Sequence, residues 1–242
     1  MKANPVPIAV ESYGDSAVMV TVDHDRPATR RAGIVDFRAR FLARRPPGVL
    51  DVISGLESLL VEYDPLVTGP GHIEYAARLI DDLPPEPRSS GAPAPARFRI
   101  PVVFDAETGP DLANVADELG LTTAEVIDTM VSSTFTIALL GAATAPMMDG
   151  LAVPKPVRRR AEPRTDVVPG SIMIAGTNAI IQPFPGPTGW RVVGRTPHVI
   201  VDITRSRPMS YSTGDVVRFV PITADEALAL DGTFLLPEGG DA

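Results

Sequence analysis

The segment of residues 84–96 constrains the fold of this chain more than any other part of its sequence. It reads PPEPRSSGAPAPA, and such a run of Pro, Ser, Gly and Ala can join folded parts but cannot fill a hydrophobic core. We therefore expect a domain of residues 1–83, a linker of residues 84–96, and a domain of residues 97–242. Hydrophobic residues make up 44% and charged residues 21% of the 242 residues, as is typical of a globular protein.

The N-terminal segment alternates between strand and helix patterns. Residues 17–22 and 59–63 are short β-rich apolar runs that turn residues precede or follow. Between them, residues 28–45 carry apolar side chains at near-helical spacing, and residues 73–83 predict a second helix. The pattern indicates a small α+β domain with helices on one face of a sheet.

The C-terminal segment changes from mixed to all-β character along its length. A helix is expected over residues 111–119, and Thr122 with Glu125 forms a capping box for the next one. Short β-rich runs then follow, separated by turns rich in Pro and Gly, which is typical of a small barrel or sandwich. One β-rich run, residues 99–104, precedes the helices. The runs that follow the helices are residues 134–140, 171–175, 179–183, 190–194 and 215–220.

Composition removes several classes of function. The chain has no Cys and only three His, which are far apart in sequence, so no metal site is expected. A net charge of −8 argues against nucleic acid or an anionic membrane as the main partner. Residues 129–148 are uncharged but rich in small and polar side chains, so we expect no membrane span and a cytoplasmic protein. No P-loop, G-x-S-x-G or H-E-x-x-H pattern is present, and we assign no catalytic nucleophile or base.

Two arginines are candidates for anion binding. Arg164 stands between Pro163 and a Thr–Asp turn, and Arg195 follows the glycine that ends a short strand. A guanidinium held rigidly beside a barrel mouth suits a carboxylate or phosphate, because it can donate two parallel hydrogen bonds. The triple arginine of residues 158–160 is interpreted as a solvated loop with scattered surface ion pairs, and the alternative is that an anion or an acidic partner neutralises it. Trp190, the only tryptophan, is expected to anchor the core.

Three spaced motifs together resemble one family. They are PRTxVxxGSxxIAG at residues 163–176, GW-x-x-x-GRTP at 189–197 and GDxVRFVPI at 214–222, and residues 13–17 and 109–112 resemble further landmarks. The chain resembles the carboxyltransferase-type family called allophanate hydrolase subunit 1. That family includes the B subunit of ATP-dependent 5-oxoprolinase and an inhibitor of a sporulation histidine kinase.

The resemblance implies a cyclophilin-like β-barrel after the small α+β domain. It also implies a partner, subunit 2 (the C subunit) of the same family, in a heterodimer or heterotetramer with a composite pocket, and possibly a third hydrolase subunit. ATP would act at the level of the complex, and no cofactor is expected in this chain. Carboxyltransfer would require biotin, for which the chain has no attachment sequence.

Some positions depart from the family pattern. Residues 141–151 read GAATAPMMDGL where relatives carry aromatic residues, Met130 and Phe135 stand where relatives commonly have His and Tyr, and residues 178–183 also differ. We expect a retained scaffold with a diverged pocket, in which Asn178 contacts an amide and Pro146 and Met147 form the wall. The leading hypothesis is a subunit of an ATP-dependent amide-bond hydrolase of the 5-oxoprolinase or allophanate-hydrolase type. The alternative is a non-enzymatic regulator of the histidine-kinase-inhibitor type.

Overall fold

The computed structural model describes residues 7–82 and 94–240. The chain divides into two compact units, Met1–Pro93 and Ala94–Ala242. Residues 84–93 of the predicted linker lie outside the described residues, and residues 94–96 lead directly into the first strand of the second unit.

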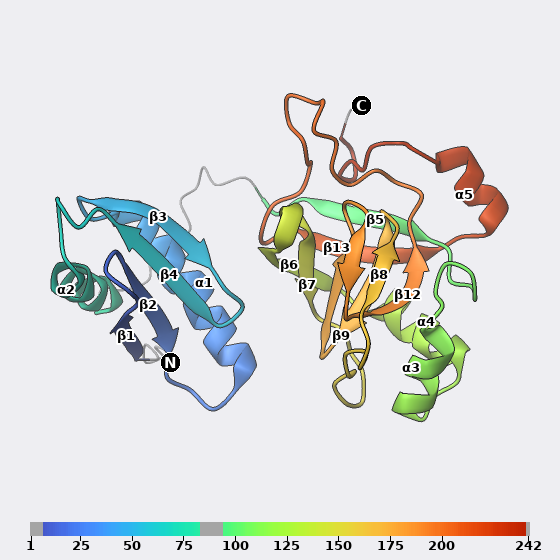
Figure 1. Ribbon diagram of the computed structural model, residues 1–242, viewed down its shortest axis with the longest axis horizontal. Coiled ribbons are helices and arrows are strands. Elements are labelled where there is room, and N and C mark those ends of the chain that lie inside the picture. The colour runs from blue at the N-terminus through green and yellow to red at the C-terminus, as the bar shows by residue number, and fades with distance from the viewer. Residues whose placement is uncertain (1–6, 83–93, 241–242) are drawn as a thin grey trace. The chain divides into compact units, whose positions relative to one another are not determined.

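The first unit is an antiparallel sheet with two helices on one face (Figure 1). The strand order is β1-β2-β4-β3, built from β1 (Ile8–Ser12), β2 (Ala17–Val22), β3 (Val49–Ser54) and β4 (Ser58–Tyr63). The helices are α1 (Pro27–Arg44) and α2 (Pro70–Asp81), and each has a proline in its first turn, where no backbone hydrogen bond is lost.

Alternation of side chains along the strands forms the core of this unit. Val18, Val20 and Val22 of β2 are buried in one cluster with Phe37 and Phe41 of α1. In addition, the guanidinium of Arg40 in α1 donates to the carbonyl of Ile80 at 2.7 Å, which ties α1 to the last turn of α2.

The second unit is a seven-stranded sheet that nearly closes into a barrel. Its order is β12-β9-β10-β7-β6-β13-β5, and only β13 and β5 pair in parallel. The strands are β5 (Arg97–Val102), β6 (Phe135–Leu140), β7 (Pro146–Asp149), β9 (Ser171–Ala175), β10 (Asn178–Ile181), β12 (Arg191–Arg195) and β13 (Val216–Pro221). An antiparallel bridge from Val103 to Arg195 joins the ends of the two edge strands.

Other elements surround this sheet. The helices are α3 (Leu112–Leu119), α4 (Thr123–Ser132) and α5 (Ala224–Leu230), with a short 3-10 turn η1 (Ala142–Thr144). A separate two-stranded ribbon is formed by β8 (Arg164–Val167) and β11 (Gly186–Thr188).

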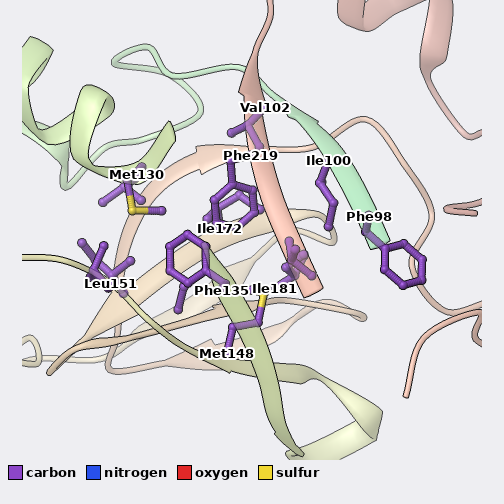
Figure 2. Close-up of a cluster of buried hydrophobic side chains, with 14 of the residues drawn as sticks. Phe98, Ile100, Val102, Met130, Phe135, Met148, Leu151, Ile172, Ile181 and Phe219 are labelled. Carbon is purple, nitrogen blue, oxygen red and sulfur yellow. The ribbon is translucent and has the colours of Figure 1, made fainter. Parts of the chain in front are cut away.

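Large side chains fill the barrel, as Figure 2 shows. The rings of Phe135 and Phe219 lie 5.1 Å apart, and Met130 of α4 belongs to the same cluster. Every residue of β9 is buried: Ile172 and Ile174 belong to the barrel core, whereas Met173 belongs to a small second cluster with Val167 of the ribbon. The described structure therefore confirms the predicted fold class, an α+β domain followed by a β-barrel.

Local sequence signals explain several boundaries. The predicted capping box is confirmed: the Thr122 hydroxyl accepts from the backbone of Glu125, whose carboxylate accepts from Thr122. Residues 129–148 form the end of α4, then β6, η1 and most of β7. In the ranges 7–82 and 94–240, no helix has the length and apolar character needed to span a bilayer.

Candidate functional site

The closure of the barrel positions Arg195. Its backbone N–H donates to the carbonyl of Val103 at 3.0 Å, and its carbonyl accepts from the N–H of Val103 at 2.9 Å. A Cβ at the preceding Gly194 would lie 2.8 Å from that Val103 carbonyl oxygen, so only glycine fits this seam. The exposed Arg195 side chain donates through Nε to the carbonyl of Pro169 at 3.2 Å.

A buried carboxylate positions Arg164. Asp111, just before α3, has a fully buried side chain that accepts from Nε and Nη2 of Arg164 at 3.2 and 3.0 Å. The same carboxylate accepts from Arg160 and from the backbone N–H of Val192 at 3.0 Å. Two guanidinium groups and one strand N–H therefore share one negative charge.

This arrangement lowers the pKa of Asp111 below its ordinary value. Burial acts to raise that pKa, but hydrogen bonds from Arg164 and Val192 and the charges of Arg164 and Arg160 outweigh it. The pKa of Arg164 is raised in turn, chiefly by its hydrogen bond to Asp111. The carboxylate stays ionised in the folded protein.

Arg164 and Arg195 line one cleft of about 360 Å³, here called the arginine cleft. Ser171 at the start of β9 also lines it, as do the acidic residues Glu107 and Asp166. Arg164 is already ion-paired with Asp111. The guanidinium of Arg195 is therefore the more available cation for binding an anion in this cleft.

A second cleft of about 410 Å³, here called the tryptophan cleft, adjoins the same small cluster. Val167 and Val192 of that cluster line the arginine cleft, whereas Met173 and Trp190 line the tryptophan cleft. The other walls of the tryptophan cleft come from the loop 142–145, Ile180, Gln182, the segment 183–189 and Arg159.

The remaining predicted site residues lie elsewhere. Asn178 is buried in β10, and its Nδ2 donates to the carbonyl of Met148 at 3.3 Å. Pro146 is buried and lines an apolar void of about 10 Å³ in the barrel core. Met147 is half-buried in β7, where it pairs with Ile180. Asn178, Pro146 and Met147 line neither the arginine cleft nor the tryptophan cleft.

Two interpretations of the sequence, one of the triple arginine and one of Trp190, need correction. Arg160 does not lie in a solvated loop, because it is paired with the buried Asp111. The sequence places Asp111 at the start of a helix but does not predict its ion pairs, because Arg160 and Arg164 stand far along the chain. The one sequence signal that Asp111 has a functional role is its place in the motif at residues 109–112. Trp190 is half-buried beside the small cluster and a cleft rather than in the main core.

Carboxylates of Glu107 and Asp166 line the arginine cleft, whereas no described carboxylate lines the tryptophan cleft. No described histidine lines either cleft. Within the part of the chain that the structure describes, no group of three or more His, Asp or Glu could hold a metal ion. The geometry suits binding by guanidinium, hydroxyl and amide groups.

Residues 8–211 match the model of a family described as carboxyltransferase domain, subdomain C and D. The chain belongs to this family. A curated relative, the B subunit of 5-oxoprolinase from Bacillus subtilis (strain 168), is 29% identical over 88% of this chain and 92% of its own length. The B subunit of 5-oxoprolinase from Escherichia coli O157:H7 is 34% identical over 72% of this chain and 79% of its own length.

Solved structures extend the comparison to longer proteins. The crystal structure of TTHA0988 is 27% identical with a TM-score of 0.67, and the match covers 87% of this chain but 40% of that protein. The urea amidolyase of K. lactis, at 19% identity and a TM-score of 0.74, shows likeness of fold over 95% of this chain and 16% of the enzyme. This carboxyltransferase-type fold is thus also found as one part of larger chains.

Proposed function

We propose that this chain is the B-type subunit of an ATP-dependent amide-bond hydrolase of the 5-oxoprolinase type. Such an enzyme opens the cyclic amide of 5-oxoproline to glutamate with hydrolysis of ATP. The observation that carries the proposal is the match to the Bacillus subtilis relative, which spans nearly the whole of both chains.

We propose further that the chain acts with a subunit 2 partner. The relatives are named as one subunit of an enzyme, and among the described residues no histidine that could serve as base lines the arginine cleft or the tryptophan cleft. Catalytic groups and the ATP site would then come from other subunits, while this chain supplies binding groups.

The arginine cleft is the proposed anion site of this chain. Arg195 is exposed at the barrel seam, its backbone is fixed by two hydrogen bonds, and Ser171 lies in the same cleft. A carboxylate or a phosphate there would meet an arginine whose backbone is fixed and whose Nε bonds the carbonyl of Pro169, so binding has to order only the end of the side chain.

Reconstitution tests the proposal. The chain is co-expressed with its subunit 2 homologue and the third subunit, and ATP hydrolysis is measured with and without 5-oxoproline. We expect a stable complex whose ATP hydrolysis depends on 5-oxoproline. Arg195→Gln should lower kcat/KM by about tenfold or more, because a charge-assisted hydrogen bond contributes about 1.5–3 kcal/mol.

A matched control is Arg207→Gln, which changes an exposed arginine that lines neither cleft and should leave turnover unchanged. Absence of 5-oxoproline-dependent ATP hydrolysis in the complete mixture would contradict the proposed enzyme. If the chain then remained separate from subunit 2 and bound a histidine kinase, the regulatory alternative would replace it.

A further inference from the structure

The tryptophan cleft has the features of a second binding site, separate from the arginine cleft. We propose that it binds a small ring compound carrying one carboxylate, with Arg159 as the counter-ion, Gln182 as the hydrogen-bond acceptor and Trp190 as the apolar wall. To the extent that the ligand is identified as 5-oxoproline, the inference rests on the proposed function.

The walls of this cleft are apolar and stiff. Trp190, Met173 and Ile180 present apolar surface, and prolines at 183, 185 and 187 fix the backbone along another wall. A compact ring would be desolvated against such a surface without ordering flexible side chains, which favours binding.

Arg159 supplies the only charged side chain among the described residues that line the cleft. Its guanidinium lies over the indole of Trp190, 5.9 Å from the ring centroid. The neighbouring backbone is fixed, because the N–H of Arg160 donates to the carbonyl of Gly189 at 2.8 Å and that of Arg158 donates to Glu118 at 2.8 Å. A positive charge held beside an apolar wall selects a carboxylate over a neutral ligand.

Gln182 supplies a directed acceptor. Its backbone is held between Ser171 and Gly170, with bonds of 3.0 and 2.8 Å. Its side-chain Nε2 donates to the carbonyl of Phe184 at 2.8 Å, which fixes the amide and leaves Oε1 to accept from a ligand N–H. A Cβ at Gly186 would lie 3.3 Å from that Nε2, so the glycine gives the amide its space.

The rim of the cleft is strained and anchored. Ala143 and Thr144 adopt φ values of 54° and 64°, which residues other than glycine rarely adopt. The hydroxyl of Tyr211 donates to the carbonyl of Thr144 at 3.0 Å and holds this loop in place. Strain of this kind persists where the surrounding structure determines it, and it gathers at ligand-binding sites.

A carboxylate, an N–H donor and a small apolar ring are the three ligand features that these groups recognise. A five-membered cyclic amide with a carboxylate on the ring, as in 5-oxoproline, has all three. Proline analogues without the ring carbonyl would carry a cationic nitrogen, which the neighbouring Arg159 repels.

Fluorescence of the full chain tests this directly, because Trp190 is its only tryptophan. The chain is titrated with 5-oxoproline, with 2-pyrrolidinone, which lacks the carboxylate, and with cyclopentanecarboxylate, which lacks the amide. We expect a saturable change with 5-oxoproline and affinities at least about tenfold weaker for each of the other two.

Variants assign the effect to the cleft. Arg159→Gln should weaken 5-oxoproline binding about tenfold or more, whereas Arg158→Gln, its exposed neighbour outside the cleft, should bind as the unsubstituted chain does. If the chain alone binds no ligand, the same pair of variants is compared by KM in the reconstituted complex. Equal affinities, or equal KM values where only the complex binds, overturn the proposal.

The two proposals can fail separately. If the complex shows 5-oxoproline-dependent ATP hydrolysis but Arg159→Gln and Arg158→Gln have equal affinity or KM for 5-oxoproline, the proposed function stands. The proposal that the tryptophan cleft binds the ligand is then refuted. If the chain binds 5-oxoproline saturably and Arg159→Gln weakens that binding, but the complete complex hydrolyses no ATP, the tryptophan cleft stands as a binding site. The proposed function is then refuted.

Discussion

Replacement of Asp111 by Asn should be among the most destabilising single polar changes in the barrel unit. The substitution preserves shape and an acceptor for the N–H of Val192, but it removes the negative charge that Arg160 and Arg164 share through direct ion pairs. Breaking a buried ion pair by removing one partner costs about 3–5 kcal/mol. Because the two arginine side chains are 24% and 30% exposed and can partly rehydrate, we expect a cost of about 3 kcal/mol, at the lower end of that range.

Urea unfolding of the full chain measures this cost. Fluorescence of Trp190 follows the barrel unit alone, since the first unit contains no tryptophan. With an m-value of about 2 kcal/mol/M, a loss of about 3 kcal/mol lowers the urea midpoint by about 1.5 M. Asp166→Asn is the matched control: it removes an exposed carboxylate near Arg164, and its effect should stay within about 0.5 kcal/mol.

The pH dependence gives an independent check. Because the folded pKa of Asp111 is depressed, its contribution is fully present above the unfolded value of about 3.9 and is lost as pH falls through the lower folded value. Asp111→Asn should therefore lose less stability than the unsubstituted chain on acidification. A midpoint shift corresponding to less than about 1 kcal/mol at neutral pH would show that the pair does not hold α3 to the barrel.

Three further predictions concern the cleft rim and the C-terminal loops. Ala143→Gly should raise the free energy of unfolding by about 1 kcal/mol through relief of a positive φ, whereas Ala142→Gly should not, and urea unfolding of the two variants decides this. Tyr211→Phe should lower the free energy of unfolding by about 1 kcal/mol, because it removes the hydrogen bond to Thr144. Burial raises the pKa of the Tyr211 phenol to about 12, so the same variant should remove one phenol titration from the ultraviolet absorbance at alkaline pH. Burial lowers the pKa of His198 despite its bond to Thr233, so stability should fall as pH drops below about 6.5, and His198→Gln should flatten the Tm profile in that range.

Much of the fold is predictable because its signals are local. The strand β2, the helix α3 and the capping box at Thr122 depend on neighbouring residues, and the patterns predict them within one or two positions. The strands β1, β3, β7, β8 and β11 and the helix α5 escape those patterns. Prolines stand within β7 and β11, where they are tolerated at the first residue of a strand or in a short ribbon, so a rule that ends every strand at proline fails there.

The site is less predictable because its contacts join distant positions. The motifs indicate that Arg164 and Arg195 both stand near strand ends, and both line one cleft. The carboxylate that fixes Arg164 cannot be deduced, since nothing in a linear pattern says which arginine a buried Asp will meet. Asn178 shows the converse limit: a polar residue in an altered motif suggests a ligand contact, which stays a prediction, and the pattern does not reveal that its Nδ2 bonds the carbonyl of Met148 on the neighbouring strand.

Asp111 also determines how the two clefts depend on each other. Through Arg164 it fixes one wall of the arginine cleft, and through Arg160 it fixes the residue next to Arg159 in the tryptophan cleft. Its bond to the N–H of Val192 ties both arginines to β12, the strand that follows Trp190 and ends at Arg195. One buried carboxylate thus bonds Arg164, which lines the arginine cleft, and Arg160, which follows Arg159 of the tryptophan cleft in sequence. Asp111 itself lines neither cleft, so loss of its charge should act on both clefts only through the arginines that it bonds.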